Sequence, residues 1–272
     1  MSLLEPPVSL NQKPYPGLAQ SLLVLLLFLV FSTLLALPWY VLTALKLTRW
    51  AQWALVLGQL GGVFLTFKVC LSKGRLTWAN VLPHQTVSHG VWPLTLVVSM
   101  GLILVLNGID GWVNHLVPAS PAFRQAFMPM GWPSIVVGAP LCEEALFRGL
   151  ILGGFALRYG ATRGILYSAL LFGLIHMNPW QLPAGLVLGV FYGWLILRTG
   201  SLWPPVFAHL LNNLFVTLAY AYQVPHLSDP GFQPFWMWSL GLLLTGSGLA
   251  SLVRSTARFN PRIPPQFVSG SY

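Results

Sequence analysis

The chain has 272 residues, of which 56% are hydrophobic and only 7% are charged. Soluble domains carry roughly 25% charged residues, so this composition excludes an ordinary soluble domain and favours a membrane protein. The formal net charge of +9 comes from basic residues scattered singly or in pairs between apolar runs. A nucleic-acid-binding protein would show a clustered basic stripe instead. We therefore expect the lipid bilayer, and no nucleic acid, as a partner.

Long apolar stretches follow one another along the chain. A run of about 18 or more apolar residues is long enough to cross a membrane as a helix. The pattern predicts an all-α membrane protein, a bundle of about eight transmembrane helices, over residues 18–45, 52–72, 91–109, 133–157, 163–177, 183–199, 202–222 and 236–253. The first stretch contains Pro38 and is expected to bend there. The fifth is short and ends at the stop signal Asn178-Pro179.

The basic residues predict the orientation of the bundle, because cytoplasmic loops carry an excess of Lys and Arg. A cytoplasmic N-terminus places on the inside Lys13, Lys73, Arg75, Arg158, Arg163, Arg198, Arg254, Arg258 and Arg262. Only Lys46, Arg49 and Arg124 then fall outside. We expect an integral protein of a bacterial plasma membrane with both termini in the cytoplasm.

Two longer connections are predicted, over residues 73–90 and 110–132. The second contains Asp110, His115 and Arg124 together with several aromatic residues. We expect this second connection to lie along the membrane interface.

Three glycines recur every fourth residue in the sixth predicted span, at Gly185, Gly189 and Gly193. This spacing places them on one face of a helix and lets a neighbouring helix approach closely. The expected role is structural: this helix packs against the helices that carry the candidate site.

The acidic residues are few, and two of them lie side by side inside the fourth predicted span. The five are Glu5, Asp110, Glu143, Glu144 and Asp229. A charge at the bilayer centre costs about 2.5–3.5 kcal/mol on insertion scales, so an adjacent pair indicates a functional site. Glu144 and Arg148 share a helix face and are expected to pair, while Glu143 points about 100° away and is free to face a water-filled cavity. Pro140 is expected to kink the helix just before the pair. The alternative interpretation is a buried structural ion triad.

Two further spans carry polar residues at helical spacing. Phe172 and His176 are four residues apart, as are His209 and Asn213. Polar groups in hydrocarbon need partners, so Glu143, His176, His209 and Asn213 are expected to meet near the membrane midplane. The set suits hydrolysis of a peptide bond: a glutamate and a neutral imidazole can deprotonate a water, and an imidazole N–H and an amide can stabilise an oxyanion.

Three motifs occur in order, each on its own predicted span: E-E-x-x-x-R at Glu143, Glu144 and Arg148, F-x-x-x-H at Phe172 and His176, and H-x-x-x-N at His209 and Asn213. Together they resemble the type II CAAX prenyl proteases and bacteriocin-processing enzymes, also called the abortive-infection or CPBP intramembrane metalloproteases. The resemblance covers residues 131–220, a CAAX protease-like catalytic core. It leaves an N-terminal transmembrane region at 1–130, and a C-terminal span and cytoplasmic tail at 221–272.

The resemblance implies an all-helical membrane endopeptidase, a hydrolase whose substrate is a prenylated or other membrane-associated peptide or protein. By analogy, Glu143 is the general base that holds the attacking water with His176, while His209 and Asn213 form the oxyanion site. The site residues implied are then Glu143, Glu144, Arg148, His176, His209 and Asn213.

The requirement for a metal is left open by the residues. The family name implies a metalloprotease, although a metal-free glutamate mechanism is also proposed for the family. Glu143, His176 and His209 are candidate ligands for a zinc ion with an open fourth position, and Glu144 would then be the base. We expect a metal-independent reaction, with zinc as the alternative.

Two other functions compete with proteolysis. A proton-coupled transporter would use the glutamates and histidines as a relay, but is expected to show paired broken helices and inverted halves. A non-catalytic homologue, such as an immunity or scaffold protein, would keep the fold alone. The intact motifs count against that second alternative.

Overall fold

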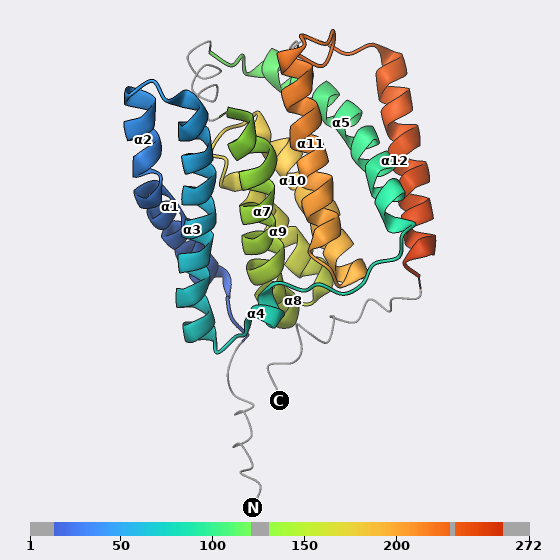
Figure 1. The fold of residues 1–272 in the computed structure, drawn as a ribbon. Coiled ribbons are helices and arrows are strands. Elements are labelled where there is room, and N and C mark those ends of the chain that lie inside the picture. The colour runs from blue at the N-terminus through green and yellow to red at the C-terminus, as the bar shows by residue number, and fades with distance from the viewer. Residues whose placement is uncertain (1–13, 121–130, 229–231, 258–272) are drawn as a thin grey trace, which may run out of the picture.

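The computed structural model describes residues 14–120, 131–228 and 232–257, and its long helices lie side by side as a bundle (Figure 1). In chain order the helices are α1 (Leu18–Leu35), α2 (Leu37–Ala44), α3 (Thr48–Gly74), α4 (Trp78–Val81), α5 (Val91–Leu116), the π-helical η2 (Pro133–Gly138), α7 (Ala139–Glu144), the π-helical η3 (Ala145–Ile151), α8 (Leu152–Tyr159), α9 (Ala161–Leu174), α10 (Gln181–Thr199), α11 (Trp203–Ala221) and α12 (Phe235–Ser255). The regular elements of these described ranges are all helical, which confirms the predicted all-α class.

Each of the eight predicted stretches forms helix. Five helical segments are long and apolar enough to cross a membrane: Leu18–Ala44, Arg49–Gly74, Val91–Leu116, Gln181–Thr199 and Phe235–Ser255. The other three predicted spans carry the motifs, and their polar residues or short length keep them out of this group. The protein is therefore an integral membrane protein, while the count of eight crossings stays a prediction.

The predicted connection at 110–132 is partly wrong. Helix α5 continues to Leu116, so Asp110 and His115 lie on its last turns. The apolar residues Ile109 and Val113 keep the helical pattern going past the predicted end at residue 109. Arg124 lies outside the described residues. The other connection, at 73–90, contains the short helix α4.

The bend expected at Pro38 is present as a helix break. Helix α1 ends at Leu35, and α2 begins at Leu37 with Pro38 in its first turn. Proline lacks the N–H that would continue the preceding helix, but it is well tolerated in a first turn. One long apolar stretch thus becomes two helices.

The fourth span is one continuous helical run from Pro133 to Tyr159 in which α-helix alternates with wider π-helical turns. The π-helical η2 ends directly before α7, and Pro140 lies inside the first turn of α7. A regular α-helix would drive the proline ring against the carbonyl of Val136. The wider turn of η2 lies directly before this ring and gives it room, and the kink expected at Pro140 stays a prediction. Such segments are frequent at functional sites.

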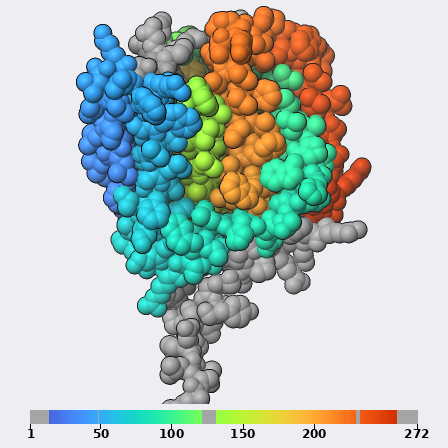
Figure 2. Space-filling view, viewed as in Figure 1, coloured from blue at the N-terminus to red at the C-terminus, as the bar shows by residue number. Residues whose placement is uncertain are grey.

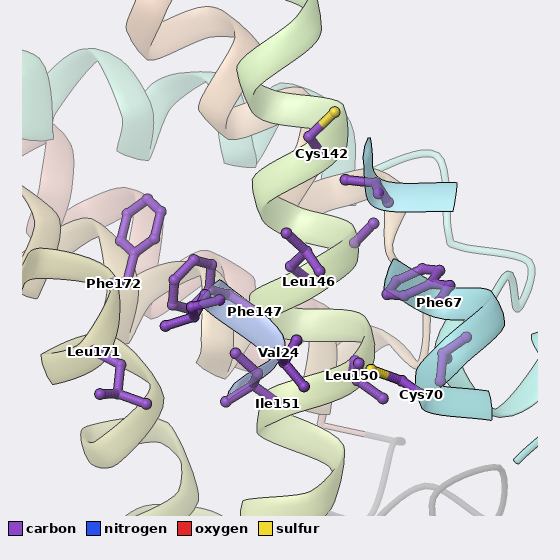
Figure 3. Close-up of a cluster of buried hydrophobic side chains, with 14 of the residues drawn as sticks. Val24, Phe67, Cys70, Cys142, Leu146, Phe147, Leu150, Ile151, Leu171 and Phe172 are labelled. Carbon is purple, nitrogen blue, oxygen red and sulfur yellow. The ribbon is translucent and has the colours of Figure 1, made fainter. Parts of the chain in front are cut away.

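This run is also the centre of one of the hydrophobic clusters of the bundle. Figure 3 shows Leu146, Phe147, Leu150 and Ile151 projecting from it toward neighbouring helices. Their partners are Val24 of α1, Phe67 and Cys70 of α3, and Leu171 and Phe172 of α9. The helix with the acidic pair is therefore held on several sides by apolar contacts.

The glycines of α10 allow it to lie against α9. A Cβ atom on Gly185 would lie 2.7 Å from the Cα of Gly173, and one on Gly189 would lie 2.8 Å from the Cα of Ala169. Side chains at these positions would force the two backbones apart. This confirms the predicted packing role of the glycine face.

The first described helix begins, and the last one ends, on the same side of the bundle. In Figure 1 this is the lower side, where α1 starts and α12 finishes. The arrangement agrees with termini on one side of the membrane. Which side faces the cytoplasm stays a prediction.

Candidate active site

The predicted ion pair between Glu144 and Arg148 is present and buried. Arg148 Nη1 donates to Glu144 Oε1 over 3.0 Å, and the two side chains are 1% and 0% exposed. The guanidinium also donates through Nη2 to the carbonyl of Gly189 over 3.4 Å. It lies 4.3 Å from the ring centre of Phe172 and 5.2 Å from that of Tyr192. Two aromatic faces and a carboxylate thus compensate a charge that has left water.

Glu144 has a second partner that sequence reasoning missed. His209 Nδ1 lies 2.8 Å from Glu144 Oε1, although the two residues are 65 positions apart. An ionised carboxylate only accepts hydrogen bonds, so Nδ1 carries the proton. Glu144 Oε1 therefore accepts from both Arg148 and His209 and links α7, η3 and α11. Its other oxygen, Oε2, is buried with no hydrogen-bond partner among the described residues.

Glu143 lies on the opposite side of the same imidazole. Its Oε2 is 3.9 Å from His209 Nε2, beyond hydrogen-bond distance, and its side chain is 24% exposed. The two adjacent glutamates therefore differ sharply. Glu144 is buried and engaged, whereas Glu143 is partly accessible, as the helical spacing predicted.

Two aromatic rings enclose the imidazole of His209. Tyr192 of α10 stacks on it with ring centres 5.4 Å apart and planes 26° apart. Phe172 of α9 approaches edge-on at 5.8 Å. Phe172 belongs to a recognised motif, but Tyr192 does not, and its spacing within a glycine-rich apolar helix carries no signal of a site.

His176 lies beside this centre but outside the helix that was predicted to carry it. Helix α9 ends at Leu174, and His176 follows in a turn. Its Nδ1 lies 2.8 Å from the carbonyl oxygen of Phe172, and its ring meets that of Phe172 edge-on at 5.3 Å. The expected direct meeting with Glu143 is not among the hydrogen bonds of the described residues. Phe172 instead separates His176 from His209 by contacting both rings.

Asn213 is held at both ends of its amide. Its Nδ2 donates to the carbonyl of Ile135 over 2.8 Å, and its Oδ1 accepts from Asn212 Nδ2 over 3.3 Å. Ile135 belongs to η2, the π-helical segment before the acidic pair. One N–H of the Asn213 amide remains available for another acceptor.

The candidate metal ligands do not form a metal site. Within the part of the chain that the structure describes, no three His, Cys, Asp or Glu side chains gather where they would hold one ion. Glu143 and His209 approach each other, but no hydrogen bond or ion pair joins His176 to either of them among the described residues. As placed, these three side chains do not gather around one ion, and the requirement for a metal stays a prediction.

The helix with the acidic pair is reachable from outside the bundle. Figure 2 shows a strip of the run Pro133–Tyr159 between α3 and α11. Figure 1 places α7 between the same two helices. Part of the helical run that carries the acidic pair therefore reaches the surface between these two helices.

The fold defines an integral membrane protein, and comparisons with known proteins place it in a family of membrane peptidases. Residues 125–215 match the family described as type II CAAX prenyl endopeptidase Rce1-like. The Bacillus subtilis (strain 168) protein "Putative membrane peptidase YdiL" is 34% identical over 170 residues, which cover 57% of this chain and 69% of that protein. An "Uncharacterized 24.3 kDa protein" of Escherichia coli is 29% identical over 161 residues, covering 55% and 74%. No solved structure matches. The chain belongs to the Rce1-like family.

Proposed function

We propose that the protein is an intramembrane endopeptidase that hydrolyses a peptide bond with a water activated by glutamate and histidine. Its substrate is a prenylated or other membrane-associated peptide. The observation that carries the proposal is the placement of His209 between two carboxylates, 2.8 Å from Glu144 and 3.9 Å from Glu143. A purely structural ion cluster would bury and engage both glutamates, but here the Glu143 side chain is 24% exposed and makes no hydrogen bond among the described residues.

Glu143 is the proposed general base. Its carboxylate takes a proton from a water, and the water oxygen attacks the carbonyl carbon of the peptide. The same proton then passes to the leaving amine nitrogen as the C–N bond breaks. His176 supports this step, because its Nδ1 donates to the Phe172 carbonyl and leaves a lone pair on Nε2. That nitrogen can accept a hydrogen bond from the attacking water.

The negative charge that develops on the carbonyl oxygen needs donors. Asn213 has one N–H engaged with Ile135 and a second N–H to offer. His209 donates through Nε2 only as an imidazolium, since its Nδ1–H is occupied by Glu144. Donors fixed before the reaction stabilise an oxyanion without reorganisation. Arg148 and Glu144 are positioning residues in this scheme, since they act through His209.

Comparison of the peptide ends of a bacterial membrane proteome tests the proposal. The wild-type enzyme and Glu143→Gln are produced at equal abundance, and new peptide ends are identified by mass spectrometry. We expect some peptide ends to appear only in membranes that contain the wild-type enzyme. Purified wild-type protein should then cleave a synthetic peptide that spans such a site.

The same peptide is then prepared with and without a prenyl thioether on a cysteine beside the cleaved bond. A strong preference for the prenylated form supports CAAX-type specificity, whereas equal cleavage supports a broader membrane peptidase. If the two membrane proteomes have identical ends and Glu143→Gln binds partners as wild type does, the chain acts as a non-catalytic homologue. A proton flux that Glu143→Gln abolishes would favour the transporter.

A further inference from the structure

Tyr192 is a fully buried residue of α10 that lies outside the three motifs. Its ring faces His209 at 5.4 Å, with an angle of 26° between the planes. Its hydroxyl has no hydrogen-bond partner among the described residues. The contact between Tyr192 and the candidate site is therefore made by the ring face.

The imidazole of His209 needs such a contact. One short hydrogen bond, from Nδ1 to Glu144, fixes the position of one ring atom but leaves the ring plane able to tilt by rotation about the side-chain bonds. Phe172 limits this rotation at its edge, since the two rings are perpendicular at 87°. Tyr192 limits it over the whole ring face, because a stacked ring cannot be turned without separating the two surfaces.

The glycine face of α10 explains how Tyr192 reaches this position. Gly189 precedes Tyr192 by three residues and brings α10 close to α9 at Ala169. The carbonyl of Gly189 accepts from Arg148 Nη2, and the guanidinium carbon lies 5.2 Å from the Tyr192 ring. The same turn of α10 thus contacts both the cation and the histidine that share Glu144.

We propose that Tyr192 is a positioning residue for His209. Its ring keeps the imidazole plane oriented so that Nδ1 stays on Glu144 and Nε2 faces Glu143. The proposal deepens the proposed peptidase function and rests on it. The neighbouring Phe191 offers a matched comparison, because it is also buried and contacts the rings of Tyr192 and Trp194, but no ring contact among the described residues joins it to His209.

The kinetic test compares Tyr192→Leu, Tyr192→Phe and Phe191→Leu on the synthetic peptide defined above. We expect Tyr192→Leu to lower kcat by about 10- to 100-fold with KM changed less than about three-fold, because small misplacements of a reacting group have effects of this size. Tyr192→Phe keeps the ring and should stay within about three-fold of wild type. Phe191→Leu should lose thermal stability but keep kcat. Tyr192→Met, whose unbranched and flexible side chain adapts better to the space left by the ring, replaces Tyr192→Leu if that variant does not fold.

A second readout does not depend on activity. In ¹⁵N-histidine-labelled protein, the signal absent from His209→Gln identifies His209. We expect a single Nδ1–H signal in wild type and Tyr192→Phe, and a broadened or shifted one in Tyr192→Leu. If wild type cleaves no peptide while these spectra hold, the proposed function fails and the positioning contact stands. The positioning role is overturned if Tyr192→Leu keeps both kcat and the signal. It is also overturned if Tyr192→Phe loses as much kcat as Tyr192→Leu, or if Phe191→Leu loses kcat equally.

Discussion

Replacement of Glu144 by alanine tests how the buried charges are held. The change removes the acceptor of two hydrogen bonds, from Arg148 at 3.0 Å and from His209 at 2.8 Å. It leaves the guanidinium of Arg148 buried without a carboxylate. Breaking a buried ion pair in this way costs about 3–5 kcal/mol of unfolding free energy. At about 2–4 °C per kcal/mol, the melting temperature should fall by roughly 6–20 °C.

The assay is thermal unfolding of detergent-purified protein followed by tryptophan fluorescence, since the chain has 12 tryptophans. The control is Glu143→Ala at the adjacent position. Glu143 is partly exposed and makes no hydrogen bond among the described residues, so its removal should change the melting temperature by no more than a few degrees. A fall that is equally large in both variants would mean that the site tolerates no change in this helix.

A double variant separates the orphaned charge from lost packing. Glu144→Leu combined with Arg148→Met removes both charges and keeps most of the volume. Replacing a buried ion pair by apolar residues of similar size is often neutral or stabilising. We therefore expect the double variant to melt well above Glu144→Ala. If the double variant is no more stable than the single one, the argument from an uncompensated Arg148 is refuted.

Three further predictions concern the oxyanion donor, the metal and the helix contact. Asn213→Ala should lower kcat by about 100- to 1,000-fold with a much smaller change in KM, and Asn213→Asp should be at least as damaging because a carboxylate repels the oxyanion. Asn212→Ala removes only the hydrogen bond that Asn212 donates to the Asn213 side chain, so it should change kcat little. If Asn213→Asp stays active, Asn213 does not stabilise the oxyanion. Peptidase activity should persist after treatment with a chelator, with little zinc found by metal analysis, whereas stoichiometric zinc whose removal and return switch activity off and on would overturn this expectation. Gly189→Val should lower the melting temperature, because the added Cβ lies 2.8 Å from the Cα of Ala169, while Gly246→Ala on α12 meets no atom within 4 Å and should not; equal melting of the two variants would contradict the close packing of α10 on α9.

Local patterns in the sequence were enough for much of the fold. Apolar runs predicted helix in all eight places, because a backbone in hydrocarbon must satisfy its own hydrogen bonds. Pro38 marked the break between α1 and α2, since proline cannot continue a helix. The pair of Glu144 and Arg148 was also predictable, because residues four apart on a helix are neighbours wherever that helix lies.

The prediction was weaker where helices begin and end. Helix α5 runs on to Leu116, and α9 stops at Leu174 before His176. The π-helical segments around α7 also left no signal beyond Pro140. Where a helix ends, and where it widens into a π-helix, depends on contacts with other helices. The local sequence does not determine those contacts.

The tertiary structure alone decided how the site is joined. The hydrogen bond from His209 to Glu144 joins two residues that are 65 positions apart in the chain, and the stacking of Tyr192 depends on the rotation of α10 about its axis. Helical spacing determines which residues share a face, but packing determines what that face meets. The sequence alone therefore identified the carboxylates, the histidines and the arginine as candidate site residues. Only the packing of α7, α9, α10 and α11 decided that one histidine would lie between the two glutamates.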